Sequence, residues 1–264
     1  LLASSAASDV YKRQEIDYVR VYQKEKKIVS GKVWRDTEGN VINAHGGGVL
    51  YHEGKYYWFG EHRPASGFVT EKGINCYSST DLYNWKSEGM FVKRDLKDGQ
   101  MSRDMTLFVD DDGKAYHIYS SEDNLTLQIA ELADDYLSHT GKYIRIFPGG
   151  HNEAPAIFKK EGTYWMITSG CTGWDPNKAR LLTADSMLGE WKQLPNPCVG
   201  EDADKTFGGQ STYILPLPEK GQFVFMADMW RPKSLADSRY IWLPVQFDDK
   251  GVPFIKWMDR WNFD

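Results

Sequence analysis

The sequence of 264 residues has little cysteine, no long apolar run and no surplus of basic charge. Its three cysteines, Cys76, Cys171 and Cys198, form no CxxC or Cys/His spacing, so they indicate neither a disulfide framework nor a zinc site; a Cys171–Cys198 bridge is an open alternative. No stretch approaches the roughly 20 apolar residues of a membrane-spanning helix. The net charge is −5 with both signs interspersed, which argues against nucleic acid as a partner.

Aromatic residues are abundant instead. They make up 14% of the chain and include 10 tryptophans. Flat apolar rings with a polar edge suit β-rich cores and also stack on the C–H faces of sugars. We expect most of these rings in the core, since large aromatic side chains are usually buried.

One pattern recurs four times along the chain. Each copy has a short apolar strand, a turn, and a glycine followed by an aromatic-rich strand. The copies begin at His45, Arg103, Glu153 and Gln210, and their glycines are Gly54, Gly113, Gly162 and Gly221. This is hairpin spacing inside a blade-sized unit, and no window carries a sustained helical period. The sequence therefore predicts an all-β propeller over residues 28–264, with about four blade repeats visible.

Residues 1–27 precede the repeats. The alternation of Ile16–Tyr22 is typical of a strand, which is either a remnant of a preceding β-sandwich module or the strand that closes the propeller. The first eight residues are either the tail of a signal peptide, although they lack its basic start and full apolar stretch, or a non-native or truncated end. We therefore expect residues 1–27 to be a segment outside the propeller domain.

The first residue of every copy is polar although the strand behind it is apolar. Innermost strands line the channel of a propeller, so His45, Arg103, Glu153 and Gln210 are expected to converge there. Glycoside hydrolysis needs a carboxylic acid that protonates the leaving oxygen. Glu153 suits that role, and Asp104, one blade earlier, is expected to tune its proton. The alternative is a polar plug that only joins the blades by hydrogen bonds.

These motifs resemble glycoside hydrolase family 43. The likeness rests on Glu153-Ala154-Pro155 and Arg103-Asp104, and more narrowly on residues 44–48, 57–61 and 208–211. The resemblance implies a five-bladed propeller, with Glu153 as general acid and Asp104 as the residue that tunes its pKa. The narrower likeness is to exo-β-1,3-galactanases, which implies an inverting hydrolase of terminal β-1,3-linked galactose in a plant-type polysaccharide. That branch uses a Gln in place of the family's base Asp, which implies that Gln210 orients the attacking water.

The sequence departs from the family pattern in two ways. Gly46 occupies the position of the usual base Asp, and too few residues lie between Trp85 and Ser102 for a fifth blade. An incomplete ring would misplace Arg103 relative to His45 and could abolish activity. Both departures favour an alternative function, a non-catalytic glycan-binding propeller. An arabinofuranosidase or xylosidase of the same family is the other alternative.

Further residues are candidates for contacts with the sugar. Trp174 and Trp230 follow second strands and are expected either to wall the site or to pack within their loops. His45, Glu61 and Arg103 are expected to bind substrate, unless Glu61 pairs with Arg63 or Arg103.

We assign no metal and expect no cofactor. Asp110-Asp111-Asp112-Gly113 resembles a calcium loop, but a hairpin turn explains it without an ion, so a structural calcium is only an open alternative. We expect a monomer that acts on an oligo- or polysaccharide. An extracellular or periplasmic location is inferred from that substrate alone.

Overall fold

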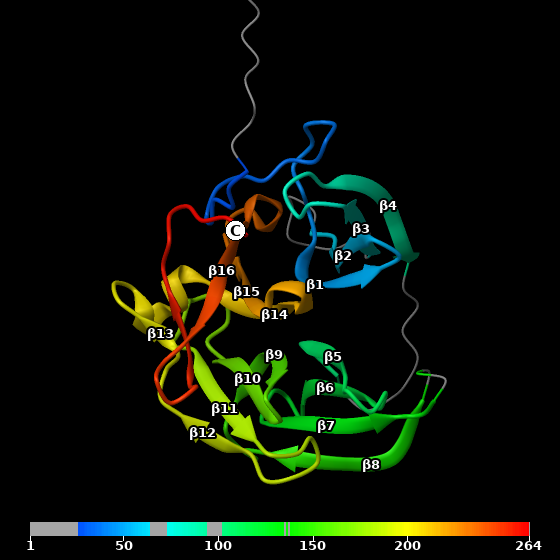
Figure 1. The fold of residues 1–264 in the computed structure, drawn as a ribbon, viewed down its shortest axis with the longest axis vertical. Helices are drawn as coiled ribbons and strands as arrows, with labels where there is room; N and C mark the ends of the chain where they lie inside the picture. Colours follow the sequence, from blue (N-terminus) through cyan, green and yellow to red (C-terminus); the bar gives the residue numbers. More distant parts are fainter. Residues whose placement is uncertain (1–25, 64–72, 94–101, 135, 137, 264) are drawn as a thin grey trace, which may run out of the picture.

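The computed structural model describes residues 26–63, 73–93, 102–134, 136 and 138–263. The N-terminal segment up to residue 25, including the strand expected at 16–22, lies outside the described residues. Within them, four sheets surround a common centre, with β1, β5, β9 and β14 innermost (Figure 1). The expected all-β propeller with four visible blades is therefore confirmed.

Three of the sheets run in chain order from the centre outward. The first consists of β1 (His45–His52), β2 (Lys55–Glu61), β3 (Gly73–Ser79) and β4 (Lys86–Lys93). The second consists of β5 (Met105–Val109), β6 (Ala115–Ser121), β7 (Thr126–Leu132) and β8 (His139–Ile146). The third consists of β9 (Asn152–Lys160), β10 (Thr163–Gly170), β11 (Arg180–Ala184) and β12 (Lys192–Leu194).

The fourth sheet has five strands. From the centre outward it consists of β14 (Gln210–Leu217), β15 (Gln222–Met229), β16 (Arg239–Phe247), β17 (Pro253–Lys256) and β13 (Cys198–Val199). Three short 3-10 helices flank its strands, η1 (Ala203–Gly208), η2 (Pro218–Lys220) and η3 (Leu235–Asp237). No helix in the described part of the chain is long and apolar enough to cross a membrane.

The repeated glycines make the inner hairpins. In the third blade Lys160 pairs with Thr163, which leaves a two-residue loop of Glu161 and Gly162. Both loop residues have positive φ, 50° and 83°. Such a loop matches the twist of the flanking strands, and glycine adopts its second position without strain.

Alternate side chains of each inner hairpin face the two neighbouring blades, as the period of a strand requires. On β10, Tyr164 and Met166 join a core with the second blade, whereas Trp165 and Ile167 join a core with the fourth. A third core lies between the first and fourth blades and contains Trp58, Trp85 and Trp242. Because β9 and β10 are buried on both faces, side chains at nearly every position of these strands are buried, and this explains the short apolar strands of the repeats.

The ring is open between the first and second blades. The inner strands β5 and β9, β9 and β14, and β14 and β1 pack on one another, but no comparable packing joins β1 to β5 in the described residues. Leu50 on β1 and Leu107 on β5 lie outside the hydrophobic cores and are 56% and 54% exposed. The fifth blade that the family resemblance implies would fall between Trp85 and Ser102, which is the part of the chain that contains the connection between these two blades.

Candidate active site

Glu153 lies near the start of β9, at a local distortion of the strand. The pairing of β9 with β10 shifts register next to Glu153, and Ala154 has a φ of 54° in the left-handed region. A bulge re-aims the side chains around it, and such a backbone persists only where its surroundings hold it. The Ala154 amide donates to the carboxyl of Asp104, and its carbonyl accepts from Ser211 Oγ at 2.6 Å.

Two amide side chains hold the carboxyl of Glu153. The residue as a whole is buried, with 7% of its surface exposed. Asn124 Nδ2 donates to Oε2 at 2.8 Å, and Gln210 Nε2 donates to Oε1 at 3.0 Å. Asn124 comes from the turn between β6 and β7 and Gln210 from the start of β14, so three blades meet at this carboxyl.

Burial is the largest cause that raises the pKa of Glu153, and the negative charge of Asp104 raises it further. Hydrogen bonds from Cys171 and Gln210 and the charge of Arg103 act in the opposite direction. The net direction is upward, so the carboxyl keeps its proton to a higher pH than an ordinary Glu. A carboxyl that keeps its proton to a higher pH is better suited to donate that proton to a leaving group.

Asp104 faces solvent, yet protein surrounds it on most sides. This desolvation is the main cause that raises the pKa of Asp104, and the charge of Glu61 adds to it. The Ala154 amide and the charges of Arg63 and Arg103 lower it. Strand β5 begins at Met105, so Arg103 and Asp104 precede the strand that the sequence predicted them to open.

Gln210 is held by three neighbours. Besides its bond to Glu153, Nε2 donates to Ser169 Oγ at 3.0 Å, and Oε1 accepts from the indole Nε1 of Trp230 at 2.8 Å. Across the β14–β15 pair, Gln210 lies opposite Asp228.

His45 lies next to Trp230, with ring centroids 5.5 Å apart. It is fully buried, its ring stacks on that of Tyr240 with centroids 5.3 Å apart, and Nδ1 is 3.4 Å from Asp228 Oδ1. The other carboxylate oxygen of Asp228 accepts from the Gly46 amide at 2.5 Å. The structure therefore buries His45 beside Trp230, where it has no surface open to a sugar.

Glu61 and Arg103 both form ion pairs at the rim. Arg63 Nη2 lies 2.7 Å from Glu61 Oε2, which is the pairing that the sequence analysis weighed against a sugar contact. Arg103 Nη2 donates to Asp123 Oδ1 at 2.8 Å, and both side chains are largely exposed. Arg103 thus turns toward its own blade and does not meet His45 at the centre.

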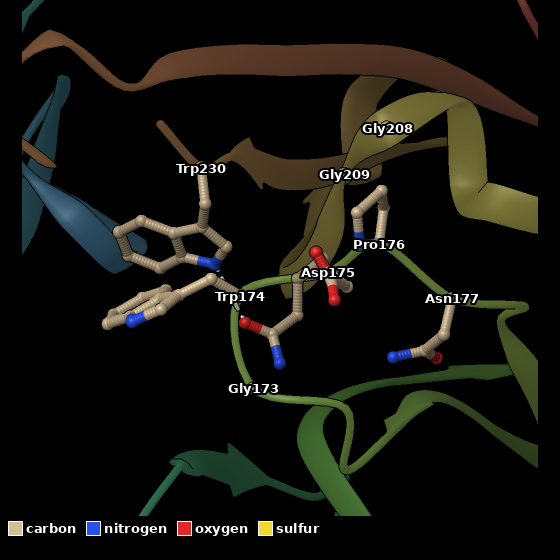
Figure 2. A pocket seen from close by; sticks show the side chains of 9 residues that line it. Gly173, Trp174, Asp175, Pro176, Asn177, Gly208, Gly209 and Trp230 are labelled. Atoms are coloured by element: carbon tan, nitrogen blue, oxygen red, sulfur yellow. Dashed lines mark hydrogen bonds between the residues drawn. The ribbon is translucent and has the colours of Figure 1, made fainter. Parts of the chain in front are cut away.

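Trp174 and Trp230 wall a small depression beside Gln210. Their ring centroids are 5.2 Å apart in an edge-to-face arrangement, and Arg63 lies 5.7 and 5.6 Å from them. Figure 2 shows the two indoles together at one end of the depression and Asn177 at the other. The remaining lining residues are Gly173, Asp175, Pro176, Gly208, Gly209 and Gln210.

Metal-binding geometry is not found in the described residues, where no three His, Cys, Asp or Glu side chains are grouped to hold an ion. In the loop that resembles a calcium site, Lys159 Nζ lies 2.6 Å from Asp110 and 2.9 Å from Asp111.

Sequence reasoning missed Asn124 and Asp228, which contact Glu153 and His45. Asn124 lies in a turn, and Asp228 is the one acidic residue in the largely apolar strand β15 (Gln222–Met229). A buried strand does not retain a carboxylate without a partner, so this interruption was an available signal for Asp228.

Comparisons with known proteins match the chain to glycoside hydrolases. The model of glycosyl hydrolases family 43 matches residues 95–212. A solved GH43 β-1,3-galactosidase with galactodeoxynojirimycin is 66% identical with a TM-score of 0.85, over 89% of this chain and 100% of that chain. An exo-β-1,3-galactanase from Clostridium thermocellum is 30% identical with a TM-score of 0.80, over 89% and 66% of the two chains.

Curated proteins also match this chain over part of their length. The β-D-galactofuranosidase xynD of Aspergillus niger is 31% identical over 121 residues, which are 45% of this chain and 35% of that protein. The chain spans about a third of the length of the curated relatives it matches. Because the 66% identical galactosidase is covered over its whole chain, the family is established: this chain belongs to glycoside hydrolase family 43.

Proposed function

We propose that this protein is a glycosidase that releases terminal β-1,3-linked galactose from a plant-type polysaccharide with inversion at the anomeric carbon. The observation that carries the proposal is the buried carboxyl of Glu153, held by side chains from two other blades and with its pKa raised by burial and by Asp104. The 66% identical relative, which is a β-1,3-galactosidase, supports the choice of sugar.

In this proposal Glu153 gives its proton to the glycosidic oxygen while the bond from the anomeric carbon to that oxygen breaks. Water attacks the anomeric carbon from the opposite face and loses its proton to solvent. Asp104 keeps Glu153 protonated, and Trp174 offers a ring that is 43% exposed to the sugar. Inverting enzymes separate the acid from the water-activating group by about 6.5–9.5 Å. Gln210 Nε2 donates to Glu153 Oε1 at 3.0 Å, so in the proposal this hydrogen bond breaks before the Gln210 N–H holds the water.

The test is release of galactose from β-1,3-galactan by the wild-type protein and by Glu153→Gln. A panel of aryl β-galactosides, α-arabinofuranosides and β-xylosides in the same assay separates the proposed sugar from the alternatives in the family. We expect galactose from the wild type alone and turnover of galactosides only. Turnover of arabinofuranosides or xylosides in place of galactosides would contradict the proposed sugar.

One observation favours a second candidate, a propeller that binds glycan without turnover. The ring is open between β1 and β5, so the centre receives side chains from four blades where the family has five. Calorimetric binding of β-1,3-galactobiose without release of galactose would support this candidate.

The proposed location is extracellular or periplasmic, where polysaccharide is found, and we propose a monomer without a cofactor.

A further inference from the structure

The orientation of the Gln210 amide is fixed by Trp230. An indole nitrogen can only donate a hydrogen bond, so the atom 2.8 Å from it must be the amide oxygen. The amide nitrogen then faces the other way, 3.0 Å from both Glu153 Oε1 and Ser169 Oγ.

The other partners of Gln210 do not discriminate between its two orientations. The Ser169 hydroxyl donates or accepts equally well. Ionised Glu153 accepts from the amide nitrogen, but protonated Glu153 can donate, and it would then bind the amide oxygen if the amide turned. When Glu153 carries its proton, Trp230 is the one partner of Gln210 among the described residues that opposes that turn.

Trp230 is itself held firmly. Its ring lies 5.2 Å from Trp174, 5.5 Å from His45 and 5.6 Å from the Arg63 guanidinium. His45 is fixed in turn by Tyr240 and Asp228, so two blades support the position of this indole.

We infer that Trp230 is a positioning residue whose indole N–H keeps the amide oxygen of Gln210 turned away from Glu153. The proton of Glu153 then stays free for the glycosidic oxygen, a consequence that rests on the proposed function. Gln210 presents an N–H to the centre, which holds a ligand oxygen but accepts no proton. In this orientation Gln210 is a donor that places water, not a base.

The test removes the indole N–H and follows the protonation of Glu153 directly. Protein labelled with carbon-13 at glutamate carboxyls is titrated by NMR, and the Glu153 resonance is assigned by its loss in Glu153→Gln. In Trp230→Phe the amide is free to turn and to accept from protonated Glu153, so the midpoint is expected to move to higher pH. Trp174→Phe is the matched control, because it keeps an aromatic ring against Trp230 and leaves the Trp230–Gln210 hydrogen bond in place, and its midpoint is expected to stay at the wild-type value.

Kinetics supply the second readout. We expect kcat of Trp230→Phe to fall about tenfold with little change in KM, and Trp174→Phe to change mainly KM. A wild-type midpoint in Trp230→Phe, or equal shifts in both variants, would overturn the inference. Replacement of Trp230 by 3-benzothienylalanine, which has sulfur in place of the N–H, repeats the test if the Phe variant does not fold. Failure of the wild type to release galactose would count against the proposed function alone, since the titration needs no turnover.

Discussion

Glu153→Gln should remove the transferable proton and leave the fold intact. Both carboxylate oxygens of Glu153 accept amide N–H groups, so the new NH2 group would face one of these donors. Asn124 resolves the conflict, because its Oδ1 is buried without a hydrogen-bond partner and a turn of this amide presents that oxygen to the new NH2. We therefore expect the free energy of unfolding to change by less than about 1 kcal/mol.

The activity of this variant should depend on the leaving group. A general acid contributes about 10²- to 10⁴-fold, which at 1.36 kcal/mol per tenfold is about 2.7–5.4 kcal/mol of transition-state stabilisation. A sugar alkoxide needs the full contribution. A dinitrophenolate leaves without a proton, so the kcat/KM of Glu153→Gln on a dinitrophenyl galactoside should fall by less than about tenfold.

The assay compares kcat/KM of the wild type and Glu153→Gln on β-1,3-galactobiose and on 2,4-dinitrophenyl β-galactoside. Urea unfolding of both proteins checks the fold. Equal losses on the two substrates would refute the assignment of Glu153 as the proton donor, and so would wild-type activity of the variant on galactobiose.

Three further changes test other parts of the structure. Asp104→Asn removes the negative charge that raises the pKa of Glu153, so the basic limb of the pH profile of kcat/KM should move to lower pH; an unmoved limb would contradict this. Trp58→Ala should lower the free energy of unfolding by about 3–5 kcal/mol in a urea titration, because Trp58 is 1% exposed within the aromatic core; a loss below 1 kcal/mol would be inconsistent with that packing. Lys159→Met should cost about 1–3 kcal/mol at neutral pH, since it leaves Asp110 with little solvent and without its cation. Lys159 helps to lower the pKa of Asp110, so the stabilisation is present above the ordinary Asp pKa of about 3.9 and is lost as the pH falls; a loss that persists undiminished in acid would contradict the ion pair.

The sequence was sufficient to predict the blades and the partnership of Glu153 with Gln210. Glycine turns and alternating strands are local signals, and equivalent strand starts meet at the centre of any propeller. This is why two residues 57 positions apart could be placed together before their hydrogen bond was seen.

Residues whose roles depend on detailed geometry were not predictable in the same way. Arg103 pairs with Asp123 because the chain turns between β6 and β7, and that turn also brings Asn124 to Glu153. His45 begins β1 and Glu153 lies near the start of β9, but the ring of Trp230 lies against His45 and Asp228 binds it from β15. Neither outcome follows from spacing, since both depend on how neighbouring blades pack.

Proton NMR of the first galactose released from β-1,3-galactan tests the central claim most directly. A general acid at the centre of this four-bladed ring, acting with water on the opposite face, predicts that the α-anomer appears first and that its signal then decays to the equilibrium mixture. Initial release of the β-anomer, or no release of galactose by the folded wild-type protein, would contradict the account.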